Sequence, residues 1–209
     1  MRPLLSLLLA FAFVTPAFAT EPPEWCVRVY ISKRGNDNVP ESMGSGSLIS
    51  PTRVVTNFHV VEGREADNAV EILFGDWTVI KGKVVAESEQ WDLAIIEIES
   101  VTYKTLPIGQ DPKANVSGSI HGYGYGPYLK QTGIISGFVN ATSMGLGSDE
   151  GDEADDLRLL VGAGARSGDS GGAVVRDGKL VGILNLSNGK NTVFIVPTQL
   201  RNLLKTLDK

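Results

Sequence analysis

The chain has 209 residues, with 19 Lys and Arg against 24 Asp and Glu, and its formal net charge is −5. Hydrophobic residues make up 42% and charged residues 21%, which excludes a disordered or collagen-like chain. The acidic balance argues against nucleic acid as the main partner, because phosphate binding requires a basic face. A single Cys cannot form an internal disulfide, so a buried apolar core must hold the fold.

The first 19 residues have the three parts of a secretory signal peptide. Arg2 and the amino terminus supply positive charge, an apolar run occupies residues 4–14, and residues 17–19 form a small-x-small cleavage site. The apolar run is shorter than the roughly 17–25 residues that a membrane-spanning helix needs. We therefore predict cleavage after Ala19, a secreted or periplasmic location, and no stable membrane insertion of the mature chain.

Twelve short runs rich in Val, Ile and Thr follow, and Gly, Pro, Asn and Asp separate them. Many short strands with turn residues between them are typical of an all-β sandwich or barrel. A polar stretch at 107–115 divides the runs into two groups of six, which favours two β-barrels of similar size. The runs are 27–31, 46–49, 53–56, 69–74, 78–85, 93–98, 117–120, 132–139, 157–161, 172–175, 180–186 and 192–196.

The last segment has a helical period instead. Leucines recur at 200, 203, 204 and 207 after Pro197, a residue that suits the first turn of a helix. We therefore predict a short C-terminal helix packed on the barrels. The predicted organisation is a signal peptide at 1–19, an N-terminal barrel at 20–106, a linker at 107–115, a C-terminal barrel at 116–196 and a helix at 197–209.

The strongest local signal is the string Gly168-Asp169-Ser170-Gly171-Gly172. A Ser between glycines is exposed, and the backbone N–H groups beside it can bind a developing oxyanion. The string also matches the G-x-S-x-G turn of α/β-hydrolases, whose general-base His follows the Ser in the chain. Both histidines of this chain, His59 and His121, precede Ser170. That interpretation therefore fails, and the order His, Asp, Ser remains.

Further motifs support this order. His59 lies in the string TNFHVV at 56–61, after GSLI at 46–49, and Asp92 lies in WDLA at 91–94, while TGIISG occupies 132–137. On these motifs the sequence resembles the chymotrypsin-fold, trypsin-like serine peptidases, and their style is closest to the bacterial Deg-type (high-temperature-requirement) branch. The resemblance covers about residues 27–205. It implies two antiparallel six-stranded β-barrels with the active site between them.

The resemblance also implies a catalytic triad. Ser170 would be the nucleophile, His59 its general base, and Asp92 the group that orients His59 and stabilises its protonated form. The backbone N–H groups of Gly168 and Ser170 would form the oxyanion hole. The implied reaction is hydrolysis of a protein or peptide substrate through an acyl-enzyme, a chemistry that needs no metal or organic cofactor. The alternatives are a non-catalytic binding protein on the same fold and an esterase that uses the same triad.

By the same resemblance, the primary specificity pocket involves Gly164, Asn185, Leu186, Ser187 and Thr192. No Asp or Glu lies near Gly164, so a preference for Lys or Arg is not expected. Thr192 narrows the pocket, which favours small or medium aliphatic side chains. Residues 185–187 should form an edge strand to which the substrate backbone can add.

Two departures from the related families limit what the resemblance implies. The activation sequence of the animal enzymes, Arg followed by Ile-Val-Gly-Gly, is absent, so activation by a new amino terminus beside Asp169 is not expected. The Deg-type enzymes usually carry a C-terminal peptide-binding domain, and none is expected here after the terminal helix at 197–209. The oligomeric state stays open.

Three features lie outside these motifs. We expect Cys26 to be a small buried residue near the first strand, with pairing to another chain as the alternative. His121 is expected to be structural. The run 149–156 contains six acidic residues, and we interpret it as a solvated surface loop, with calcium binding or electrostatic guidance of basic peptides as alternatives.

Overall fold

The computed structural model describes residues 21–33, 36–64, 69–138 and 157–208. The predicted signal peptide at 1–19 and the acidic run at 149–156 lie outside the described residues.

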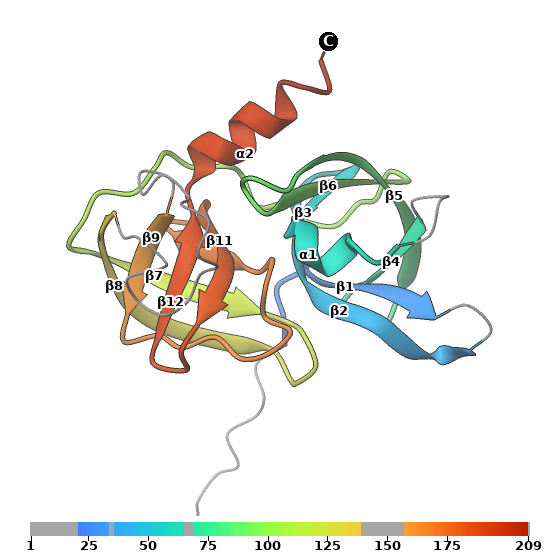
Figure 1. The fold of residues 1–209 in the computed structure, drawn as a ribbon, viewed down its shortest axis with the longest axis horizontal. Coiled ribbons are helices and arrows are strands. Elements are labelled where there is room, and N and C mark those ends of the chain that lie inside the picture. The colour runs from blue at the N-terminus through green and yellow to red at the C-terminus, as the bar shows by residue number, and fades with distance from the viewer. Residues whose placement is uncertain (1–20, 34–35, 65–68, 139–156, 209) are drawn as a thin grey trace, which may run out of the picture.

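Within the described residues, twelve strands form two closed antiparallel barrels of six strands each, side by side in Figure 1. The predicted fold class is therefore confirmed. The first barrel has the strand order β1-β2-β3-β6-β5-β4, and the second has the order β10-β11-β12-β9-β8-β7. The strands of the first barrel are β1 (Cys26–Lys33), β2 (Asn36–Ser50), β3 (Arg53–Thr56), β4 (Ala69–Leu73), β5 (Val79–Ser88) and β6 (Leu93–Ile98). The strands of the second barrel are β7 (Val116–Gly122), β8 (Leu129–Phe138), β9 (Leu157–Val161), β10 (Ala173–Arg176), β11 (Lys179–Ser187) and β12 (Asn191–Ile195).

Apolar side chains at alternate positions of the strands fill the interior of each barrel. Val27, Val29 and Ile31 recur at every second position of β1 and all three are buried, because successive side chains of a strand point to opposite faces. The same rule places Ile120 and Leu160 in the core of the second barrel. Each barrel therefore has an apolar centre of its own.

A third apolar cluster joins the two barrels to the helix α2 (Pro197–Leu204). Leu200 and Leu203 of α2 are buried in this cluster, as the leucine spacing predicts. The helix contacts β5 and β6 of the first barrel and β11 of the second, and Figure 1 shows it lying above both. The other fully buried members of the cluster with large side chains are Val55, Leu93, Ile95, Leu180, Ile183 and Ile195.

Two elements differ from the expectations. The strand β2 is much longer than the apolar run at 46–49, because its amino-terminal half pairs with β1 in a hairpin. A one-turn helix, α1 (Phe58–Val61), follows β3 directly after Asn57, and Figure 1 shows it on the side of the first barrel that faces the second. No helix among the described residues is long and apolar enough to cross a membrane.

Candidate active site

The first barrel brings His59 and Asp92 together. His59 lies on α1, and Asp92 lies in the turn between β5 and β6 with a φ of 46°. The ring atom Nδ1 of His59 is 2.8 Å from Asp92 Oδ2, and the backbone N–H of His59 donates to Oδ1 at 2.9 Å. The side-chain amide of Asn57 donates to the Asp92 carbonyl at 2.9 Å. These bonds hold an uncommon backbone conformation and orient the imidazole ring.

The same carboxylate changes the titration of His59. Its hydrogen bond to Asp92 raises the pKa of His59 above the usual 6.5, and the charges of Asp92 and Glu62 act in the same direction. Partial burial opposes this shift, since desolvation disfavours the charged ring. His59 is thus held as a stronger base than a free imidazole.

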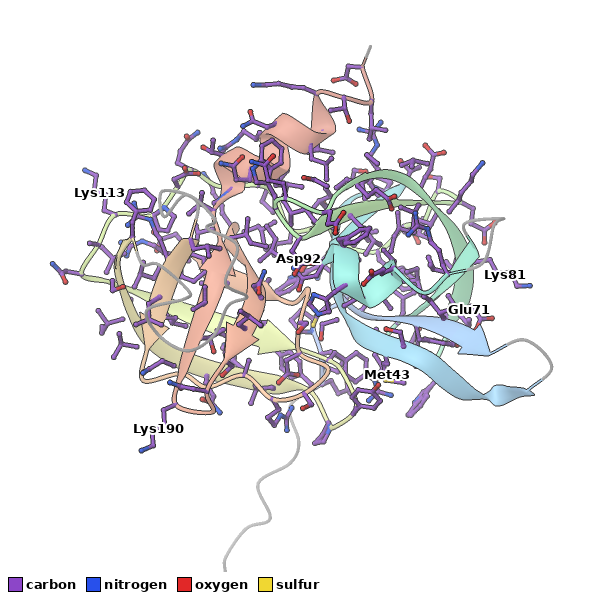
Figure 2. The ribbon with its side chains drawn as sticks, in the orientation of Figure 1. Met43, Glu71, Lys81, Asp92, Lys113 and Lys190 are labelled. Atoms are coloured by element: carbon purple, nitrogen blue, oxygen red, sulfur yellow. The ribbon has the colours of Figure 1, made fainter. Side chains whose placement is uncertain are left out.

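Asn185 on β11 connects this pair to Ser170 across the two barrels. Its side-chain amide donates to Asp92 Oδ2 at 3.0 Å, and its backbone carbonyl accepts from Ser170 Oγ at 3.2 Å. Figure 2 shows Asp92 at the boundary between the barrels. Among the described residues, no hydrogen bond joins Ser170 Oγ to His59. The structure therefore holds the serine hydroxyl on Asn185, beside the His59–Asp92 pair.

Two backbone donors of the loop 168–172 are without an acceptor in the described part of the chain. The N–H groups of Asp169, Gly171 and Gly172 donate to the carbonyls of Arg166, Leu184 and Asp169. The N–H groups of Gly168 and Ser170 have no acceptor within the described part of the chain. Gly168 has a φ of 84°, a conformation that Gly adopts without steric cost. These are the two donors that are predicted to form an oxyanion hole.

Asp169 has a structural partner. Its side chain is 1% exposed, and its Oδ2 accepts from the backbone N–H of Arg166 at 2.8 Å and from Arg166 Nε at 3.3 Å. Arg166 also donates to the Pro127 carbonyl at 2.7 Å. A buried carboxylate requires such partners, and here a residue three positions earlier supplies them.

A cavity of about 190 Å³ lies beside Ser170. Four of the five predicted pocket residues line it, and they are Asn185, Leu186, Ser187 and Thr192. Gly164 is not among the lining residues; its N–H donates to Gln131 Oε1 at 3.0 Å, and a Cβ added to it would lie 2.1 Å from the Gly189 carbonyl oxygen. Ala165, Arg166 and Ser167, which follow Gly164 in the chain, are among the lining residues, and the role of Gly164 stays a prediction. Leu184 completes the lining, which contains no acidic side chain.

His121 and Cys26 lie in the interior. His121 is hydrogen bonded to Ser119 and Tyr128, and burial lowers its pKa to about 4, with a smaller contribution from the charge of Lys130. Cys26, the first residue of β1, is fully buried, and desolvation raises the pKa of its thiol well above the usual range. In the part of the chain that the structure describes, no cluster of three His, Cys, Asp or Glu could hold a metal ion.

A two-barrel fold with a His–Asp pair and a glycine-flanked Ser at the junction defines the class of trypsin-like peptidases. The family model described as trypsin-like peptidase domain matches residues 44–183, and the chain belongs to this family. Two similar proteins are a probable periplasmic serine protease, Do/HhoA-like, from Haemophilus influenzae (31% identity, 75% of this chain, 32% of that protein) and an HtrA-like serine protease from Staphylococcus aureus (30%, 80% and 24%). These relatives confirm the predicted resemblance to the Deg-type branch. The chain spans about a third of the length of the Haemophilus protein.

Solved structures agree on the fold. The inactive form of the Rv3671c protease of M. tuberculosis has a TM-score of 0.69 at 21% identity, covering 92% of this chain and 95% of that one. The serine endoprotease from Yersinia pestis has a TM-score of 0.70 at 20% identity, covering 90% and 64%.

Proposed function

We propose that this chain is an exported serine endopeptidase that uses a triad of His59, Asp92 and Ser170. The observation that carries the proposal is the 2.8 Å bond between His59 Nδ1 and Asp92 Oδ2, at a junction where Ser170 lies on the neighbouring barrel. This bond leaves the other ring nitrogen, Nε2, to accept a proton. A structural His–Asp pair would not require a glycine-flanked serine beside it.

The reaction starts when Ser170 Oγ turns from the Asn185 carbonyl toward His59. Neutral His59 takes the hydroxyl proton at Nε2 while Oγ attacks the substrate carbonyl carbon, and Asp92 stabilises the imidazolium that forms. The N–H groups of Gly168 and Ser170 bind the oxyanion of the tetrahedral intermediate. His59 then gives the proton to the leaving amine as the C–N bond breaks. Water, activated by the same base, releases the acyl group and restores the Ser170 hydroxyl.

The cavity beside Ser170 supports a proposal for the substrate class. Its lining is apolar or hydroxyl-bearing except for Asn185 and Arg166, so a basic side chain before the cut would find no carboxylate among the lining residues. The hydroxyl of Thr192 donates to the Ala163 carbonyl and accepts from the Ala165 N–H, and these bonds fix the position of this side chain in the lining of the cavity. We therefore propose a preference for small or medium aliphatic side chains, with the substrate backbone added along β11 at residues 185–187.

The export part of the proposal rests on residues 1–19, which have the pattern of a signal peptide. The name of the Haemophilus influenzae relative includes a periplasmic location, which agrees with it. The proposed place of action is the periplasm or the medium.

A fluorophosphonate probe tests the proposed nucleophile, because it reacts covalently with an activated serine. We expect the protein to be labelled near neutral pH and Ser170→Ala to remain unlabelled. Ser167→Ala is the matched control, since Ser167 lines the same cavity and should leave labelling unchanged. Absence of label on folded protein, or label that persists in Ser170→Ala, would contradict the triad.

Substrate assays separate peptidase from esterase and test the pocket. The endopeptidase proposal predicts cleavage of casein, and of peptides with Val before the cut in preference to the same peptides with Lys. Hydrolysis of nitrophenyl esters alone would favour an esterase, and preferential cleavage after Lys would refute the pocket assignment.

A further inference from the structure

Ser45 is a fully buried residue of β2 whose polar groups are all hydrogen bonded. Its backbone N–H donates to the Ser170 carbonyl at 2.8 Å, and its carbonyl accepts from Thr56 Oγ1 at 2.7 Å. Its Oγ donates to the Gly168 carbonyl at 3.0 Å and accepts from the Tyr123 N–H at 2.8 Å. Three of these four partners belong to the second barrel, so Ser45 is a bonded link between the barrels.

Two of these bonds hold the loop 168–172, which carries the N–H groups predicted to form the oxyanion hole. Ser45 binds the carbonyls of Gly168 and Ser170, while the N–H groups of the same two residues have no acceptor among the described residues. Because each peptide group is planar, fixing a carbonyl fixes the orientation of the peptide that contains it. The bonded carbonyls belong to the peptide groups 168–169 and 170–171, and the Ser170 N–H belongs to the peptide group between them. The Gly168 N–H belongs to the peptide group just before 168–169.

The loop needs such an anchor because its glycines allow many backbone conformations. Gly168 and Gly171 both have positive φ and no Cβ to restrict rotation. The loop also lies very close to β2, since a Cβ on Gly171 would be 2.3 Å from the Ser45 carbonyl. Small rotations in this loop would turn the Gly168 N–H away from a bound substrate.

We propose that Ser45 is a positioning residue that aligns the oxyanion donors of Gly168 and Ser170 with the His59–Asp92 pair. Ser45 belongs to the same barrel as His59 and Asp92, whereas the loop belongs to the other barrel. Its bonds therefore set the loop relative to the base. The inference rests on the proposed peptidase function and names a residue that touches neither the substrate nor the reacting atoms.

Ser47 provides a matched control on the same strand. It lies two residues further along β2, is also fully buried, and its Oγ has no hydrogen-bond partner among the residues that the structure describes. Ser47→Ala therefore removes an equally buried hydroxyl without removing a bond to the loop.

The experiment compares Ser45→Ala, Ser47→Ala and the unaltered protein by kcat, KM and the affinity for a peptide aldehyde, whose hemiacetal with Ser170 places an oxygen in the oxyanion hole. Concentrations are corrected by titration of reactive Ser170 with a fluorophosphonate. For Ser45→Ala we expect kcat to fall by about 10- to 100-fold, less than the roughly 10²–10³ of a deleted oxyanion donor. The aldehyde affinity should fall in parallel while KM stays within about twofold. Ser47→Ala should match the unaltered protein in all three quantities.

Three results would overturn the positioning role: unchanged kcat and aldehyde affinity in Ser45→Ala, equal losses in both variants, or a change confined to KM. If Ser45→Ala does not fold, Ser45→Cys keeps the shape but bonds weakly, and the same criteria apply. Activity in the unaltered protein and in Ser47→Ala, with no effect at Ser45, refutes only this inference. Inactivity of the unaltered protein refutes the proposed function itself.

Discussion

Both carboxylate oxygens of Asp92 are hydrogen bonded. Oδ1 accepts from the His59 backbone, and Oδ2 is shared by the His59 ring and the Asn185 amide. Hydrogen bonds to a charged acceptor are stronger than neutral ones, so this carboxylate is a fixed negative charge beside the imidazole. The raised pKa of His59 follows from it.

A pH profile of kcat/KM measures this effect. His59 acts as a base only when neutral, so activity should fall as the pH drops through its raised pKa, with the midpoint of the acid limb above 6.5. Asp92→Asn should lower the rate by about 10⁴-fold, the size known for this arrangement, and shift the residual acid limb to lower pH. An acid limb at or below 6.5 in the unaltered protein would contradict the interpretation.

At the residue scale, the sequence singles out candidate residues that lie in motifs and gives no sign of those that do not. His59, Asp92 and Ser170 lie in recognisable strings. Asn185 was assigned only to substrate binding, although its amide also contacts Asp92, 93 positions away in the chain. No sequence pattern indicates the role proposed for Ser45, because a Ser in a strand has the same local sequence whether or not its hydroxyl is hydrogen bonded.

The loop 168–172 and the strand β2 act together as elements. Gly171 packs so closely on β2 that a Cβ there would be 2.3 Å from both the Ser45 carbonyl and Thr56 Oγ1. Gly178, in the turn between β10 and β11, also has a positive φ, of 70°, but nothing lies within 4 Å of an added Cβ. Gly178 is therefore required only for its backbone conformation, whereas Gly171 is also required because the loop lies so close to β2.

Alanine at each position tests this difference. Gly178→Ala should destabilise the protein by roughly 1–2 kcal/mol, the cost of the left-handed conformation for a residue with a Cβ, and leave kcat unchanged. Gly171→Ala should cost more and lower kcat by about 100-fold or more, because the overlap displaces the loop. Urea unfolding and kcat measure the two effects. Equal losses of activity in both variants would contradict a specific contact with β2.

The whole molecule has an apolar cluster that includes residues of both barrels and of α2. Leu200 is fully buried in it, so the two barrels cannot separate without exposing apolar surface. We therefore expect the described part of the chain to unfold as one cooperative unit.

Leu200→Ala should lower the free energy of unfolding by about 2–5 kcal/mol, through lost burial and the cavity left behind. Lys205→Ala, at the exposed end of the helix, should change it by less than about 0.5 kcal/mol. Denaturant unfolding followed by tryptophan fluorescence and by activity should give coincident transitions. Two separate transitions, or equal effects of the variants, would show that α2 does not hold the barrels together.

The composition of the chain excludes disorder, its acidic balance argues against nucleic acid as the main partner, and local sequence patterns predict most of the fold. Alternating apolar residues predicted twelve strands, and leucine spacing predicted the last helix, because each signal lies within one element. The order of the His, Asp and Ser motifs predicted which residues form the site.

Only the tertiary structure decided how the two halves of the site meet. It placed Ala165, Arg166 and Ser167 in the lining of the cavity beside Ser170, bonded Ser170 Oγ to the Asn185 carbonyl, and showed Ser45 bonded to a loop 123 positions away. Contacts between segments so far apart depend on how the barrels pack. No local period or motif predicts these contacts, because the sequence pattern of each strand would be the same for another relative orientation of the two barrels.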